Sequence, residues 1–349
     1  MQNYIKRMSG AISWLRFPLI IFVILLHCSS VSKLEGNHLF FYHALYPFSL
    51  WLGETGVPCF FFISGYLFFH SSKTYKQKLL TRIHTLLIPY LLWNGIILGL
   101  YIMAFTLGYP QDIHGKNISE FTFSDYIRIF WDRGHYDQGN FVPLLCPLWY
   151  IRNLMIMCII SPIIYYIIKY GRELFLLIIT IWWLYTFDNA FIPQTILFFS
   201  IGAYFTVHNI NPLKLATDNY IVFISLFLIF AFADISSHIF YSSTHQLQLH
   251  RLSIIFNIPI LFLIADKCER HGYSNAFLSD STFIVFCCHY PITIILRKYI
   301  TYNYSYLSDY THILLYFICV IISILLSITI YFVLNKYLPR TKILLSGNR

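Results

Sequence analysis

The sequence predicts an all-α fold, a polytopic integral-membrane bundle of about ten transmembrane helices with both termini in the cytoplasm. Hydrophobic residues make up 58% of the 349-residue chain and gather in continuous apolar runs. Charged residues make up only 11%, whereas about a quarter of a soluble chain is charged. This scarcity excludes a water-soluble globule, and the high hydrophobicity excludes a disordered chain. We therefore expect one membrane domain over residues 1–349.

Ten apolar windows approach the length of roughly 20 residues that crosses a bilayer as a helix. Window 174–188 is short and aromatic, and window 191–208 follows it after only a tight turn. The first window lacks a small-x-small cleavage site and further windows follow at once, so it is not a cleaved signal peptide. The predicted windows are 11–31, 46–69, 85–107, 147–168, 174–188, 191–208, 220–236, 251–266, 282–299 and 312–334.

The Lys and Arg residues between these windows predict the orientation, because short cytoplasmic loops retain an excess of them. With a cytoplasmic N terminus, fifteen basic residues fall on the inner side and seven on the outer side. An even number of spans then returns the chain to the cytoplasm, where we expect a short basic tail over 335–349. The net charge of +9 is thus largely an orientation signal, and we expect no nucleic-acid partner.

The eight cysteines lie mostly inside or beside apolar runs and show no CxxC pairing. This placement is typical of small buried hydrophobic side chains, so we expect neither a disulfide framework nor a metal site. The longest polar stretch, 108–146, is extracytoplasmic on the predicted topology. We interpret it as a partly helical loop that lies on the membrane. The functional alternative is a cap that binds an acceptor, because acidic and aromatic side chains suit sugars.

Arg16 and His27 are ionisable residues within the first window, and such residues suggest a functional site by default. They are eleven positions apart, close to three helical turns, so both side chains emerge on one face about 16 Å apart along the axis. A histidine exchanges a proton near neutral pH and can serve as a general base or nucleophile. Two simpler interpretations stay open: an interfacial arginine whose head reaches water, and a histidine hydrogen-bonded within the bundle.

Further polar residues are expected at two depths. Glu54, Trp149 and Arg152 fall near His27 toward the outer boundary, and His289 falls at mid-depth. Glu54 and Arg152 are alternatively a mutual ion pair. The cytoplasmic boundary carries a basic layer, which either binds a polyanion or only anionic membrane lipid. Its members are Arg16, Lys73, Lys76, Lys78, Arg82 and His84.

The second window contains a Ser64-Gly65 step within bulky apolar residues. Small residues permit close approach of helices, so tight packing explains the step. Room for the arm of a ligand explains it equally well, and spacing does not separate the two.

Five segments resemble the integral-membrane acyltransferase family 3, and the resemblance covers nearly the whole chain. The most specific is Arg16-x10-His27. One position departs from the family pattern, because Thr85 stands where members often carry a second basic residue. The chain ends soon after its last window and so resembles the stand-alone members. The other four segments are Pro58 to Leu67, Arg82 to Trp93, Leu148-Trp149-Tyr150-Ile151-Arg152 and His289-Tyr290-Pro291.

The resemblance implies an enzyme of the bacterial plasma (inner) membrane that transfers an acyl group onto a cell-surface or lipid-linked carbohydrate. It implies an acyl-CoA donor, most commonly acetyl-CoA, and an O-linked product. Arg16, Lys78 and Arg82 would hold the CoA phosphates through charge-assisted hydrogen bonds. The thioester arm would pass Ser64 and Gly65.

His27 is the expected general base toward a sugar hydroxyl, or alternatively the carrier of the acyl group. Glu54 would orient His27. Arg152 would stabilise the oxyanion, with Trp149 and Tyr66 as alternatives. The expected substrate contacts are Trp149, Tyr66 and His289.

Two alternatives accompany this expectation. Transfer of succinyl or another acyl group would use the same fold and site. A transporter or flippase of a lipid-linked glycan would also carry intramembrane Arg, His and Glu residues. The absence of a detectable inverted repeat and the length of the resemblance favour the acyltransferase.

Overall fold

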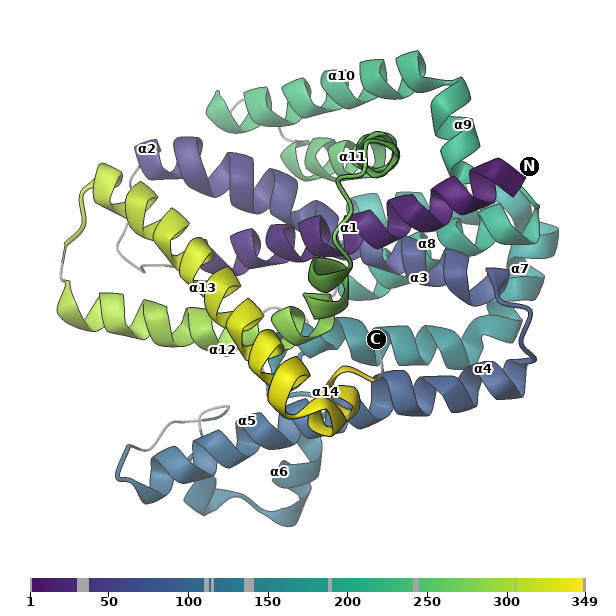
Figure 1. Cartoon of the computed structure of the whole chain (residues 1–349). Coiled ribbons are helices and arrows are strands. Elements are labelled where there is room, and N and C mark those ends of the chain that lie inside the picture. The colour runs from purple at the N-terminus through teal and green to yellow at the C-terminus, as the bar shows by residue number, and fades with distance from the viewer. Residues whose placement is uncertain are drawn as a thin grey trace.

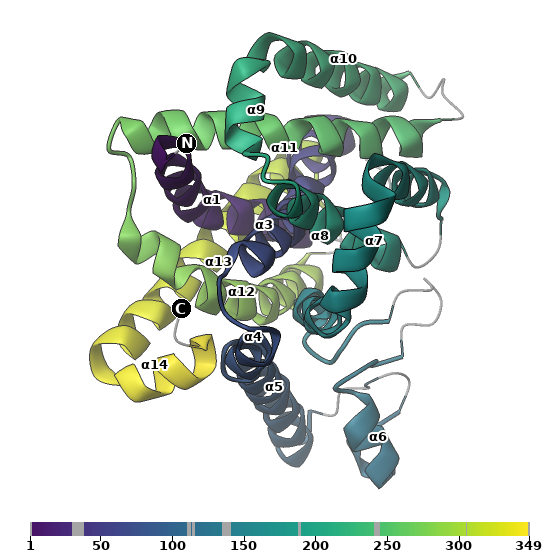
Figure 2. The same cartoon turned by 90° about the vertical axis from the view of Figure 1, so that its right-hand side faces the viewer.

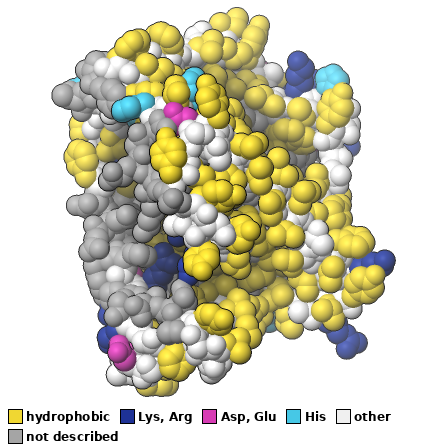
Figure 3. Space-filling model, turned by 90° about the vertical axis from the view of Figure 1, so that its left-hand side faces the viewer, with side chains coloured by type: hydrophobic (Ala, Val, Ile, Leu, Met, Phe, Trp, Pro, Cys, Tyr) yellow, Lys and Arg dark blue, Asp and Glu magenta, His cyan; other side chains and the backbone are white. Residues whose placement is uncertain are grey.

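A computed structural model describes residues 2–29, 38–109, 113, 116–134, 141–187, 190–240, 245–304 and 306–347. Within these ranges the chain is helical, with no strand beyond a single bridge between Ile113 and Lys116. The predicted all-α class is therefore confirmed. The broad hydrophobic surface in Figure 3 is the kind that a lipid environment requires.

The helices lie in the following order along the chain: α1 Gln2–Cys28, α2 His38–Phe40, η1 Phe41–Leu52, η2 Gly53–Thr55, α3 Gly56–His70, α4 Tyr75–Arg82, η3 Ile83–Leu87, α5 Ile88–Thr106, η4 Ile118–Glu120, α6 Phe123–Arg128, η6 Cys146–Leu148, α7 Trp149–Tyr185, α8 Phe191–Val207, α9 Pro212–Asp218, α10 Tyr220–Ile239, α11 Gln246–Arg270, α12 Ala276–Asn303, α13 Asp309–Tyr337 and α14 Pro339–Ser346.

The described residues contain eight helices long and apolar enough to cross a membrane, or nine if α8 and α9, which meet at 89°, form one span. Windows 147–168 and 174–188 both lie in α7, which counts here as one helix, so the number is consistent with the predicted bundle of about ten spans. Several helices also extend past their apolar windows, since polar caps continue the hydrogen bonding beyond the apolar part. Asn275 caps α12 and Ser308 caps α13 in this way.

Helix α7 consists of two arms that meet at a bend at Arg172. The first arm runs in the same direction as α8. Trp149, at its start, stacks on Phe191 at the start of α8, with ring centroids 3.8 Å apart. Further along, His208 Nε2 donates to the carbonyl of Ile168 at 3.3 Å, just past the end of α8. The first arm therefore spans the same depth as α8.

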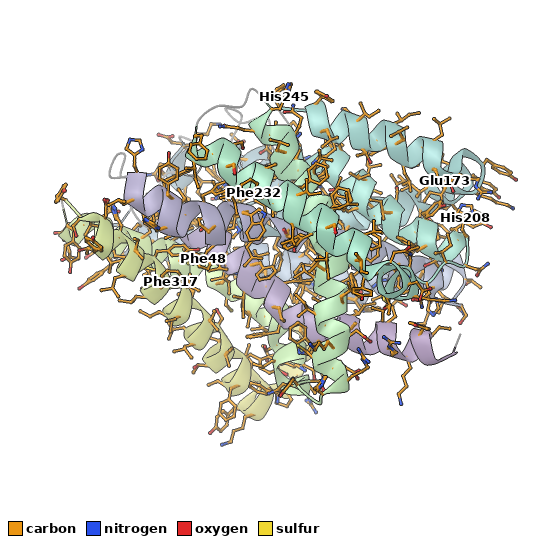
Figure 4. The ribbon with its side chains drawn as sticks, turned by 90° about the horizontal axis from the view of Figure 1, so that it is seen from above. Phe48, Glu173, His208, Phe232, His245 and Phe317 are labelled. Carbon is orange, nitrogen blue, oxygen red and sulfur yellow. The ribbon has the colours of Figure 1, made fainter. Side chains whose placement is uncertain are left out.

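The second arm of α7 returns in the opposite direction. At Arg172 the backbone takes φ 44° and ψ −131°, which interrupts the helix. Just beyond the bend, Glu173 of α7 accepts a hydrogen bond from the hydroxyl of Tyr204, which lies near the end of α8. Figure 4 shows Glu173 and His208 at the same end of the molecule. Trp183 then packs on Phe198, earlier in α8. The two arms correspond to the two predicted windows, and the bend at Arg172 separates them.

Helix α1 lies in the middle of the bundle, with α10 on one side and α5 on the other (Figures 1 and 2). It packs against α3, α11, α12 and α13. Contacts of Ser13 with Ser279 and of Cys28 with Thr293 show that α1 and α12 run in parallel. Residues near the end of α1 and near the middle of α12 are therefore brought to the same depth.

Helices α3 and α8 approach each other so closely that glycine is required on both. A Cβ atom on Gly65 would lie 2.1 Å from the carbonyl oxygen of Phe199, and one on Gly202 would lie 2.1 Å from that of Phe62. This corrects the expectation that Gly65 leaves room for the donor, because the backbone of α8 occupies the space beside Gly65. The alternative interpretation, tight helix packing, applies to Gly65.

The segment expected to be a cytoplasmic tail is a packed helix in its described part. Helix α14 turns back toward α5, where Trp93 Nε1 donates to the carbonyl of Leu345 at 3.0 Å. A Cβ atom on Gly347 would lie 2.6 Å from the carbonyl oxygen of Thr85. Gly347, the last described residue, therefore lies beside the η3 turn that precedes α5.

Candidate functional site

An inner cavity of about 280 Å³ lies between α1, α3, α7, α12 and the η3 turn. Arg16, Ser64 and Arg82 line it, so the structure brings together three of the predicted donor-binding residues. Thr85 lines it as well, so the position that departs from the family pattern faces this space.

The inner cavity carries two cations and one anion. Among the described residues, no hydrogen bond or ion pair engages the guanidinium group of Arg16 or that of Arg82, although Arg82 lies 5.8 Å from the Phe68 ring. Asp280 is the carboxylate in the lining. Lys78 sits over the same Phe68 ring at 5.1 Å, outside the lining residues. The cavity therefore offers two arginines for an anionic ligand.

Tyr150 is a lining residue that the sequence analysis missed. Its hydroxyl lies 3.0 Å from Ser64 Oγ, and the pair places two hydroxyl groups in the wall of the inner cavity. The segment that contains Tyr150 was singled out for Trp149 and Arg152. Tyr150 faces α3, because its ring also lies 4.7 Å from that of Phe61.

His27 and His289 form a pair beyond the end of the inner cavity. Their ring centroids are 5.3 Å apart, and Phe286, which lines the cavity, lies 6.1 Å from His289. His289 Nδ1 lies 3.1 Å from the carbonyl of Val285 and must donate to it, because a carbonyl only accepts. Nε2 is then an acceptor, and it is buried without a hydrogen-bond partner among the described residues. A buried polar atom in this state is suited to a substrate group.

An outer cavity of about 190 Å³ lies between α5 and α12. Tyr290 lines it and packs edge-on against His27, with centroids 5.0 Å apart. Arg133 and Lys298 are its charged lining residues. His27 thus contacts Tyr290 of the outer lining directly and reaches Phe286 of the inner lining through His289, so it lies between the two linings without being part of either.

Glu54 belongs to a different cluster from the one expected. Its Oε2 atom lies 3.0 Å from His250 Nε2, and His250 Nδ1 lies 2.9 Å from Oδ2 of the fully buried Asp234. Ser253 donates to the same Asp234 oxygen at 3.2 Å. The carboxylate of Glu54 is engaged by His250 and not by His27, which corrects its expected orienting role. The cluster joins η2, α10 and α11.

Arg152 binds backbone rather than another ionisable side chain. Its guanidinium donates to the carbonyls of Trp131 and Phe141 at 2.6 and 2.9 Å and to the side chain of Asn153. Among the described residues no ion pair joins Arg152 to Glu54, so the alternative pairing is not seen. Arg152 holds the ends of the loop segment that carries Arg133.

Trp149 and Tyr66 contribute to helix packing. Trp149 stacks on Phe191, and Tyr66 stacks on His70 with centroids 5.5 Å apart. Neither residue lines the inner or the outer cavity. His289 alone, of the three expected substrate contacts, lies beside His27.

One cysteine, Cys158, lies in the lining of the inner cavity. None of the eight cysteines forms a disulfide, and six are buried. Within the described ranges no group of three or more His, Cys, Asp and Glu side chains is arranged to hold a metal ion.

Comparison with known proteins assigns the family. The sequence pattern described as an acyltransferase domain, Acyl_transf_3, matches residues 9–332 and so includes both cavities and the histidine pair. The chain belongs to acyltransferase family 3. This family 3 member is 25% identical over 363 aligned positions to the succinoglycan biosynthesis protein ExoH of Rhizobium meliloti (strain 1021), an alignment that covers 98% of this chain and 92% of the relative. No solved structure matches it. Its apolar helices and its family together define a multi-pass membrane acyltransferase.

Proposed function

We propose that this family 3 protein is an O-acyltransferase that moves an acyl group, specifically acetyl, from cytoplasmic acetyl-CoA to a hydroxyl of a carbohydrate. The position of His27 between two cavities carries the proposal. A group-transfer enzyme must hold its donor and its acceptor on either side of one reacting centre. The name of the Rhizobium relative, a succinoglycan biosynthesis protein, supports a glycan acceptor.

The inner cavity suits the donor. Arg16 and Arg82 would bind CoA phosphates through charge-assisted hydrogen bonds. Their guanidinium groups are available for this, because no hydrogen bond or ion pair engages them among the described residues. Its volume is at the lower end of the range for small-molecule pockets, about 300 Å³. The acyl-pantetheine arm would therefore occupy the cavity, and the nucleotide would stay at its cytoplasmic mouth. Ser64 and Tyr150 offer hydroxyl groups to the amides of the arm.

The chemical step assigns His27 as general base. As the sugar oxygen attacks the thioester carbonyl, an imidazole nitrogen of His27 accepts the hydroxyl proton, and the new acyl–oxygen bond forms. The carbon–sulfur bond then breaks, and the proton passes to the thiolate of CoA. His289 Nε2, an acceptor without a partner among the described residues, would accept a hydrogen bond from a neighbouring hydroxyl of the sugar and so help to position the attacking one. In the alternative mechanism, His27 first takes the acyl group from CoA as an acyl-histidine and then passes it to the sugar hydroxyl.

The test is mass spectrometry of cell-surface glycans from cells that express the wild-type protein, the H27A variant or the R16A variant. We expect membrane insertion of both variants and loss of the acyl mass increment, which in the wild type also identifies the acyl group. The matched control is His271→Ala, an exposed histidine outside the inner cavity and the basic layer, which should keep the increment. Full acylation by the H27A variant contradicts the mechanism. Loss of the whole glycan, acylated or not, indicates transport instead.

A further inference from the structure

The outer cavity has an apolar lining that reaches the lipid-facing surface. Apart from Arg133, Lys298 and two tyrosines, every described residue in its lining is apolar. Leu100 on α5 is 46% exposed and Ile295 on α12 is 66% exposed, so the cavity meets the surface between these two helices. In a membrane protein, such a surface faces acyl chains rather than water.

The two cations of the outer cavity hold different places in its lining: Arg133 lies close to Tyr290, whereas Lys298 lies about one helical turn beyond Ile295 on α12. The backbone amide of Arg133 donates to Val142 at 2.7 Å, which holds the residue in place, and its Nε atom is buried without a hydrogen-bond partner among the described residues. Arg133 interacts electrostatically with Tyr290 and His27. A buried guanidinium with an unused donor is suited to an anionic group such as a phosphate.

We infer that the outer cavity is the acceptor site, and that the acceptor is a sugar on a phosphate-linked polyisoprenoid lipid that enters sideways between α5 and α12. The lipid chain lies along Leu100 and Ile295. The phosphate binds Arg133 and Lys298, and the sugar reaches His27 past Tyr290. This inference rests on the proposed function. A finished, water-soluble polysaccharide would call for a lining rich in polar groups, which the described lining does not provide.

The experiment uses the full-length protein in lipid nanodiscs with acetyl-CoA as donor. Two acceptors are compared: a synthetic polyprenyl-diphosphate-linked hexose and the methyl glycoside of the same hexose. We expect transfer to the first at concentrations where the second is inert. The R133Q variant should raise the KM for the lipid-linked acceptor by about tenfold or more, and the R133K variant should recover part of it. CoA binding by both variants should match the wild type.

A second variant tests the sideways path without removing a charge. Ile295→Trp fills the mouth and should also raise the acceptor KM, whereas Met103→Trp, at an exposed α5 position outside the lining, should not. Equal use of the two acceptors, or unchanged acceptor KM in both R133Q and I295W, overturns the inference and leaves the acyltransferase proposal standing. Binding of acetyl-CoA without transfer to either acceptor or to extracted surface polysaccharide overturns both.

Discussion

His27 and His289 lie with their imidazole rings 5.3 Å apart, one on each of two parallel helices. The pair separates an inner cavity with two arginines from an outer cavity with an apolar mouth. His27 contacts the linings of both sides through its neighbours, whereas the free Nε2 of His289 is an acceptor only. This arrangement gives the two histidines different expected roles.

Replacing each histidine by alanine should separate those roles. His27→Ala should lower kcat by about 10²- to 10⁴-fold, the range for loss of a general base. His289→Ala should lower kcat by about tenfold, because it removes one hydrogen bond that positions the substrate. Steady-state kinetics on purified variants measures both, and thermal unfolding checks that they are folded. Wild-type kcat in the H27A variant would exclude the base, and wild-type kcat in the H289A variant would exclude the positioning role.

The cluster of Glu54, His250 and Asp234 should affect stability more than catalysis. Glu54→Gln should lower the free energy of unfolding by about 1 kcal/mol, because the Glu54 side chain is 41% exposed and screening weakens its ion pair. Asp234→Asn should cost about 3 kcal/mol, because Asp234 is fully buried against His250. Denaturation in detergent measures both. A large loss of kcat in E54Q with unchanged stability would instead restore the orienting role toward His27.

Adjacent positions on α3 should respond differently to alanine. Gly65→Ala should reduce the amount of folded protein, since the new Cβ meets the backbone of Phe199 and overpacking costs about 1–3 kcal/mol. Ser64→Ala should leave stability near wild type and raise the donor KM, because it removes the hydroxyl beside Tyr150. The control is Gly95→Ala, where nothing lies within 4 Å of the added Cβ. A stable Gly65→Ala variant would contradict the close packing of α3 and α8.

Arg82 should act on the donor through its charge. Arg82→Gln should raise the KM for acyl-CoA by about tenfold and weaken its dependence on ionic strength, because one charge-assisted contact to a phosphate is lost. Lys76→Gln is the matched control, since Lys76 is exposed and lies outside the inner cavity. An equal effect of both substitutions would show that the basic layer attracts the donor without a specific site.

Arg152 should control the loop that carries Arg133. Arg152→Lys replaces a planar fork with a single ammonium group and cannot hold the carbonyls of both Trp131 and Phe141. We expect faster amide hydrogen exchange at residues 129–134 and a higher acceptor KM, with the donor KM unchanged. Exchange at the wild-type rate in this variant would show that Arg152 does not hold the loop.

The amino-acid sequence determined those features that depend on one segment at a time. Apolar windows predicted a helical membrane bundle, because a lipid-exposed backbone must satisfy its hydrogen bonds within each helix. The period of the helix placed Arg16 and His27 on one face, since that relationship needs no information about neighbours. The Arg16-x10-His27 spacing also carried the resemblance to the family that the whole chain matches.

Tertiary structure decided which residues meet across helices. Glu54 contacts His250, 196 positions away, and the backbone of α8 lies directly against Gly65. Both contacts depend on how neighbouring helices are aligned along their axes, which packing decides. Arg133 was only one of the outer basic residues in the sequence, and the fold of its loop carries it into the outer cavity. The depth of a residue in the membrane can be predicted from its own helix alone. The residue that it contacts at that depth depends on how all the helices are rotated and spaced.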